Sequence, residues 1–118
     1  MQYLLMLYSD EAGWHRLTAP EQKQWMAAYQ AYTGALASAG ALRGGSHLAS
    51  PRTAVTVRVA GGRTQVLDGP FIETKEQLAG YFIIEAPDLD DALAWAARCP
   101  AASHGVIEVR AIGTPPSP

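Results

Sequence analysis

Two short segments of this chain are apolar on both faces of an extended strand, which restricts the kind of sheet it can build. In residues 2–8 and 81–84, apolar side chains occupy odd and even positions alike. Because successive side chains of a strand point to opposite faces, such a segment has apolar neighbours on both sides of its sheet. We therefore expect both segments to be central strands, covered on each face.

Two helices are expected to cover one of those faces. The first should begin at Thr18, which with Glu21 forms the pattern of a capping box, and should end at Gly40. Its apolar face is expected to comprise Trp25, Tyr29, Tyr32 and Leu36. The second should begin at Asp88 and stop before Pro100. Its buried face is expected to comprise Leu89, Ala92, Leu93 and Ala96. A polar loop is expected over 9–13.

A hairpin is predicted between the two helices. Valines at 55, 57 and 59 alternate with Thr56 and Arg58, which indicates a half-buried strand, and Gly61-Gly62 provides a two-residue turn. A final strand is indicated by the alternation over 107–111. The element order is strand, helix, hairpin, strand, helix, strand. It predicts an α+β, ferredoxin-like βαββαβ fold with an added hairpin strand.

The other face of this sheet needs a separate cover. Two helices of this fold lie on one face only, yet both central strands are apolar on both faces. A second copy packed sheet to sheet would supply the missing layer. We therefore expect a homodimer through the sheet face.

Composition narrows the class of protein. The 118 residues suffice for one domain, expected over 1–112, followed by a Pro-rich tail over 113–118. A net charge of −2 without any run of Lys or Arg argues against nucleic-acid and anionic-membrane binding. The apolar N-terminal stretch is too short for a signal segment or a membrane span, so a cytoplasmic protein is expected. The single cysteine and the spacing of the three histidines predict no metal site, and no cofactor motif is present.

The most unusual stretch is 68–76, Asp-Gly-Pro-Phe-Ile-Glu-Thr-Lys-Glu. Its first three residues are turn formers, and the nine residues together carry four ionisable side chains, Asp68, Glu73, Lys75 and Glu76. A connector that only turns does not need this charge beside Phe71, which we expect to be buried. The segment is therefore the first candidate for a functional site.

This stretch resembles the signature of the DGPF branch of the YCII-related proteins. The segments 78–84, 91–96 and 104–110 resemble the strand, the second helix and the closing strand that accompany it. The resemblance implies a subunit of the dimeric α/β-barrel type that dimerises through its sheet. An enzymatic role using a His–Asp pair has been proposed for the group. DGPF proteins are often encoded beside extracytoplasmic-function sigma factors, which implies a regulatory role as the alternative.

Asp68 and His104 are the candidate catalytic residues. Asp68 could act as a general base, or its carboxylate could only hold the turn by bonding backbone N–H groups. His104 is the best proton-transfer candidate because its ordinary pKa lies near neutrality, although it could equally be a surface histidine.

Arg58, Glu73 and Lys75 are the candidate substrate-binding residues. Glu73 and Lys75 share a face if the stretch is extended, so they could form an ion pair, bind a ligand, or simply be solvated. Arg58, like Glu108 and Arg110, lies on a polar strand face that is either solvated or enclosed by a dimer. Two functions remain open. One is a cofactor-independent enzyme that performs isomerase- or lyase-like proton transfer on a small anionic or aromatic ligand; the other is a non-enzymatic module that binds a sigma factor.

Overall fold

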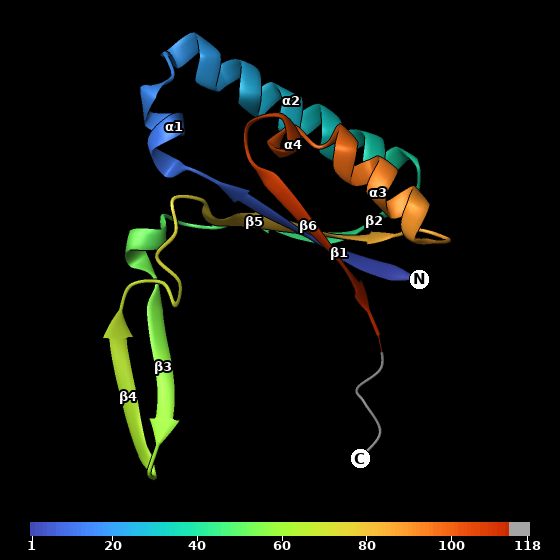
Figure 1. The fold of residues 1–118 in the computed structure, drawn as a ribbon. Helices are drawn as coiled ribbons and strands as arrows, with labels where there is room; N and C mark the ends of the chain where they lie inside the picture. Colours follow the sequence, from blue (N-terminus) through green and yellow to red (C-terminus); the bar gives the residue numbers. More distant parts are fainter. Residues whose placement is uncertain (114–118) are drawn as a thin grey trace.

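A computed structural model describes residues 1–113 and shows a two-layer α+β fold. Its main sheet is antiparallel, with strand order β2-β5-β1-β6, and the helices cover one face (Figure 1). The strands of this sheet are β1 (Gln2–Ser9), β2 (Leu42–His47), β5 (Gln77–Glu85) and β6 (Val106–Ile112). The helices are α1 (Glu11–Arg16), α2 (Ala19–Ser38), α3 (Leu89–Arg98) and α4 (Ala101–His104), with a 3₁₀ turn η1 (Pro51–Thr53). The expected tail lies mostly outside the described residues.

The two strands that read as apolar on both faces, β1 and β5, are the central pair, as predicted. Leu5 of β1 lies between Phe82 of β5 and Val109 of β6. The odd-numbered residues of β1 from 3 to 7 are buried beneath the helices. Its even-numbered residues Leu4 and Met6 are only half-buried, because they belong to the opposite face, which none of the helices described over 1–113 covers. We call this opposite side the uncovered sheet face.

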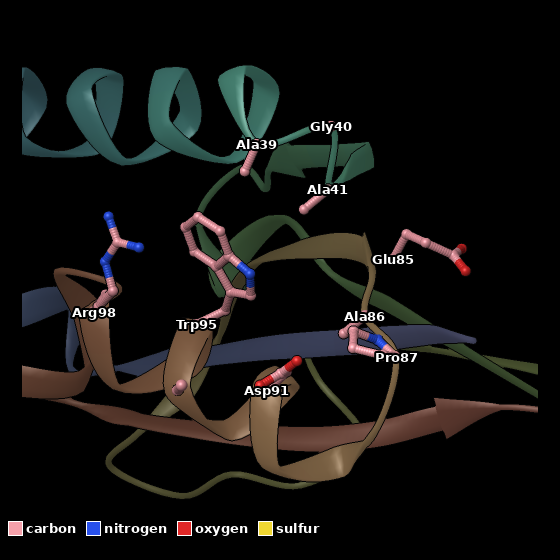
Figure 2. Close-up of a pocket in the computed structure, with 10 residues that line it drawn as sticks. Ala39, Gly40, Ala41, Glu85, Ala86, Pro87, Asp91, Trp95 and Arg98 are labelled. Carbon is pink, nitrogen blue, oxygen red and sulfur yellow. The ribbon is translucent and has the colours of Figure 1, made fainter.

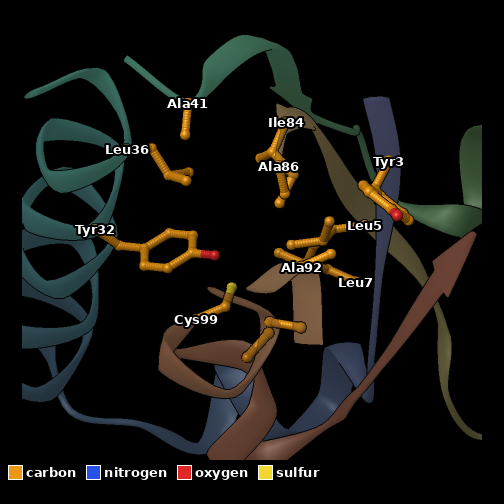
Figure 3. Packing of buried hydrophobic residues seen from close by; sticks show 12 residues of the cluster. Tyr3, Leu5, Leu7, Tyr32, Leu36, Ala41, Ile84, Ala86, Ala92 and Cys99 are labelled. Atoms are coloured by element: carbon orange, nitrogen blue, oxygen red, sulfur yellow. The ribbon is translucent and has the colours of Figure 1, made fainter. Parts of the chain in front are cut away.

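The long helix begins and packs as the sequence predicts. The Thr18 hydroxyl accepts a hydrogen bond from the Glu21 N–H at 3.3 Å, and the Glu21 carboxylate accepts one from the Thr18 N–H at 2.9 Å. Tyr32 and Leu36 are buried against the sheet. The Tyr32 hydroxyl donates to the carbonyl oxygen of Trp95 at 2.7 Å, which joins α2 to α3. Figure 3 shows Tyr32 and Leu36 pointing from α2 into the buried cluster. The core is therefore formed between the helices and one sheet face.

The predicted buried face of the second helix is half wrong. Ala92 and Ala96 are buried, but Leu89 and Leu93 are exposed. Trp95 and the buried Cys99 pack on the core instead. The reason is the helix rotation: residues 92, 95, 96 and 99 form the stripe at helical spacing that faces the sheet.

The polar loop expected over 9–13 is replaced in part by the short helix α1. Asp10 caps it, accepting a hydrogen bond from the Ala12 N–H at 3.1 Å. None of the helices described over 1–113 is long and apolar enough to cross a membrane.

The hairpin does not join the main sheet. Among the strands described over 1–113, β3 (Val55–Ala60) and β4 (Arg63–Asp68) pair only with each other, and they project from the domain as an arm (Figure 1). The fourth strand of the main sheet is β2, which follows α2 directly. The expectation of a half-buried strand at 55–59 is therefore wrong for the single chain, since Val55, Val57 and Val59 are all exposed. We call residues 55–68 the arm.

Candidate functional site

The signature stretch is the connection from the arm back to the central strand β5, and its first turn is held by backbone groups. The Gly69 N–H donates to the Ala54 carbonyl oxygen at 2.7 Å, and the Thr56 hydroxyl donates to the Gly69 carbonyl oxygen at 2.8 Å. Gly69 has φ of +106°, which residues with a Cβ rarely adopt. In residues 1–113 no hydrogen bond reaches the Asp68 carboxylate, so the turn does not depend on it.

The second half of the stretch is fixed by the side chain of Gln77. Its amide nitrogen donates to the carbonyl oxygens of Ile72 at 2.7 Å and Thr74 at 2.8 Å. Gln77 itself lies opposite Ser9 in the sheet. The loop is therefore attached to the end of the sheet where β1 finishes and β5 begins.

Phe71 is not buried, contrary to expectation. Its side chain is 70 % exposed, and neighbouring Ile72 is exposed as well. The loop is held by hydrogen bonds to its backbone carbonyls, and no helix or strand within the described residues packs over Phe71 or Ile72. Two large apolar groups of the signature therefore face outward.

An apolar hollow of about 370 Å³ lies against this loop. It is lined by Leu48, Ala49, Ser50, Pro51, Thr53, Ala54, Pro70, Gln77 and Leu78. Pro70 follows Asp68 by two residues, so the turn itself forms part of the wall. Leu78 pairs with Tyr8 across the sheet, on the uncovered sheet face. The hollow therefore adjoins both the signature loop and the unpartnered side of the sheet.

A network of polar side chains stands at the rim of this hollow. The Ser50 hydroxyl donates to Glu11 Oε2 at 2.9 Å, and His15 Nε2 lies 3.4 Å from Glu11 Oε1. The Ser50 hydrogen bond, followed by His15 and the charge of Arg52, lowers the pKa of the Glu11 carboxyl against a smaller opposing effect of burial. Glu11 thus stays ionised and can orient the imidazole of His15.

Sequence reasoning did not predict this network. Ser50 is far from Glu11 in the chain, and only the fold brings the two together. A partial signal was present, because Glu11 and His15 are four residues apart, the spacing of a helical pair. A loop over 9–13 does not have helical spacing, so the predicted loop gave no reason to pair Glu11 with His15.

His104 lies at the same end of the sheet but in the helical layer. Its ring packs edge-to-face on Trp25, with centroids 4.6 Å apart, and its Nε2 is 3.5 Å from the Tyr29 hydroxyl. Burial, with a smaller contribution from Cys99, raises the pKa of Tyr29 to about 12. The phenol therefore remains protonated at neutral pH, and its hydroxyl lies within reach of the His104 ring nitrogen.

The remaining predicted site residues are spread over the arm and loop. Asp68 is exposed at the base of the arm, and Arg58 projects from the opposite face of the same hairpin, since strand side chains alternate. Glu73 and Lys75 are exposed in the loop. Over residues 1–113 no ion pair or hydrogen bond joins Asp68 to His104, or Glu73 to Lys75. Their proposed roles stay predictions.

A second hollow, of about 480 Å³, lies at the far end of β5, between the end of α2 and helix α3 (Figure 2). Arg98 stacks over the Trp95 ring on one side of it, 4.4 Å from the ring centroid. It contains none of the predicted site residues. In the part of the chain that the structure describes, no three His, Cys, Asp or Glu side chains are grouped to hold a metal ion.

The fold is an α+β, ferredoxin-like fold, with the signature loop at one end of the sheet. The chain belongs to the YCII-related domain family, whose model matches residues 1–114. An uncharacterised protein of Rhizobium meliloti strain 1021 is 37 % identical over 112 residues, which are 93 % of this chain and 90 % of that protein.

One solved structure shares the fold at low sequence identity. It is the 5-chloro-2-hydroxyhydroquinone dehydrochlorinase TftG of Burkholderia phenoliruptrix AC1100, in complex with 2,5-dihydroxybenzoquinone. The match has a TM-score of 0.55 at 16 % identity and covers 96 % of this chain and 94 % of that one. At this identity the likeness supports the fold alone.

Proposed function

We propose that this protein is a cofactor-independent enzyme that performs proton transfer, of the isomerase or lyase type, on a small aromatic or oxo acid. One observation carries the proposal. At a single end of the sheet, the signature loop borders an apolar hollow whose rim holds an ionised carboxylate and a histidine, Glu11 and His15. An apolar cavity with a few convergent polar groups is the usual form of a small-molecule site.

Asp68 and His104 are the proposed proton-transfer pair. The Asp68 carboxylate would accept a proton from the substrate, and the His104 imidazole would return one. Asp68 suits the first role because the turn does not use its carboxylate. Lys75, Arg58 and Glu73 would contact the polar groups of the ligand, the two cations binding its anionic group. His15, oriented by Glu11, is a second candidate proton carrier at the hollow.

A second copy of the chain is proposed to complete the site. The uncovered sheet face holds Leu4, Met6, Tyr81 and Ile83 together with the charged pair Glu108 and Arg110. Packing of two such faces would bury the apolar side chains and enclose the hollow beside Leu78. A homodimer of this kind predicts twice the chain mass of 12.6 kDa by light scattering.

A titration with 2,5-dihydroxybenzoquinone, the ligand bound to TftG, is a direct first test. Calorimetry should show saturable binding to the wild-type protein and at least tenfold weaker binding to Asp68→Asn. Asp90→Asn is the matched control, since it makes the same change in the first turn of α3, far from the loop. Equal affinity of both variants would remove Asp68 from the site, and no binding of any related hydroxyquinone or aromatic acid would contradict the proposed ligand class.

The alternative is a non-enzymatic module that binds an extracytoplasmic-function sigma factor. The observation that favours it is the exposed apolar surface of the arm, because such patches mark protein–protein contacts. Under this alternative, a pull-down from cell extract with the tagged wild-type chain recovers a sigma factor. A pull-down that recovers none would contradict it.

A further inference from the structure

The arm has two chemically different faces. In its register Val57 lies opposite Val66, Val55 opposite Asp68 and Val59 opposite Thr64. Because paired residues share a face and neighbours alternate, four valines with Thr64 and Asp68 form one side. We call this side the valine face. Its four valines are 57 to 66 % exposed. The other side carries Arg58, Arg63 and Gln65 with Thr56, Ala60 and Leu67.

An arm of this composition needs a cover. An isolated two-stranded hairpin is at best marginally stable in water. Within residues 1–113 the hydrogen bonds that tie the arm to the rest of the chain lie at its base, around Gly69 and Ala54. Removing apolar side chains from water is favourable in proportion to the area buried, so covering the valine face would offset the cost of holding the hairpin.

The position of the arm identifies what would cover it. The arm projects from the sheet on the side away from α2 and α3 (Figure 1). That is the side of the uncovered sheet face, so a molecule seated on this face also lies beside the arm. The sheet face and the arm are connected through the loop that carries exposed Phe71 and Ile72. The uncovered sheet face, the loop and the arm therefore form adjoining apolar surfaces.

Charge on the uncovered sheet face favours a second copy as this molecule. Glu108 and Arg110 are two residues apart on β6, on one face, opposite Met6 and Leu4. Under a twofold axis the two faces are brought together in reversed orientation, so each acid can meet the partner's base. The same patch is then complementary to itself.

We propose that the arm closes over a second copy of this chain, with its valine face packed against that copy. This inference rests on the homodimer of the proposed function. It adds that the dimer is held by the arms as well as by the sheets. Asp68 belongs to the valine face, so its carboxylate would lie at the boundary between the two copies, and a site that uses Asp68 would be complete only in the dimer.

The test compares two double variants of the full chain by sedimentation equilibrium. Val57→Asp with Val66→Asp places two carboxylates on the valine face. Ala60→Asp with Gln65→Asp adds the same charge to the opposite face and is the matched control. We expect the first to raise the dimer dissociation constant at least a hundredfold and the control to change it less than threefold. Val57→Thr with Val66→Thr, which keeps shape and strand propensity, should give a smaller increase in the same direction.

The outcomes distinguish the arm contact from the sheet-to-sheet homodimer on which it rests. If the valine-face variants keep native circular dichroism and dimerise as tightly as the wild type, the arm contact is overturned. The sheet dimer is not affected by that result. Met6→Glu, in the centre of the uncovered sheet face, should then still dissociate it. A monomeric wild-type protein overturns both proposals. If that monomer captures a sigma factor and the valine-face variants do not, the arm binds the sigma factor instead.

Discussion

Val55 and Asp68 lie directly opposite each other at the base of the arm, so the signature carboxylate shares a face with exposed valines. The main candidate base is thereby placed on a surface that the single chain leaves uncovered. Its environment in solution depends on what packs there. A partner packed on that face would remove the Asp68 carboxylate from contact with water.

Removing the Ser50 hydroxyl should change the titration of Glu11. Because the Ser50 hydrogen bond is the largest cause of the lowered pKa of Glu11, Ser50→Ala should move that pKa up toward its ordinary value. Carboxyl-carbon NMR titration between pH 2 and about 7 measures it, with Ser103→Ala as the control, whose hydroxyl bonds a backbone carbonyl elsewhere. An unchanged Glu11 curve would mean that the hydrogen bond is not formed in solution.

The side chain of Gln77 should control the order of the signature loop. Gln77→Ala removes two hydrogen bonds to loop carbonyls, each contributing about 0.5–1.5 kcal/mol. Hydrogen exchange of the amides over 69–76 should become several-fold faster while that of β1 stays the same. Gln65→Ala, on the arm, is a control with the same loss of an amide. Unchanged exchange in the loop would contradict this role.

Gly105 should not tolerate a side chain. A Cβ at this position would collide with the carbonyl oxygen of Tyr8, where β6 begins beside the end of β1. Gly105→Ala should therefore destabilise the fold by about 1–3 kcal/mol, as overpacked sites do. In the same urea series Gly34→Ala, with open space around its Cβ in the middle of α2, should stabilise by up to about 1 kcal/mol. Equal effects of the two changes would contradict the close approach at Tyr8.

Stability should fall at alkaline pH through Tyr29. The pKa of this phenol is about 10 in an unfolded chain and about 12 in the folded protein, mainly because of burial. The folded state then binds more protons than the unfolded state between these values, so its stability is lost as pH rises from 10 toward 12. Urea unfolding from pH 8 to 11.5 measures the slope. Tyr29→Phe should flatten it, and an unchanged slope would contradict the role of Tyr29; the buried Tyr32 adds a slope of the same sign.

Local patterns in the sequence were enough to predict the central strands, the helix starts and the class of fold. The doubly apolar segments place β1 and β5 at the centre, and the caps at Thr18 and Asp88 begin their helices as predicted. Alternation and capping depend on neighbours a few residues apart, so they can be read without the fold.

Other features depended on contacts between distant segments. The exposure of Phe71, the separation of the arm from the main sheet and the contact of Ser50 with Glu11 all arise from how far-apart segments meet. Alternating valines indicate an apolar strand face but not the molecule that covers it. Alternation and capping alone thus predict the sheet-and-helix fold, and composition marks the stretch at 68–76. The position of this stretch beside an apolar hollow, with Asp68 on an uncovered face, follows from long-range packing and could not be predicted from local patterns.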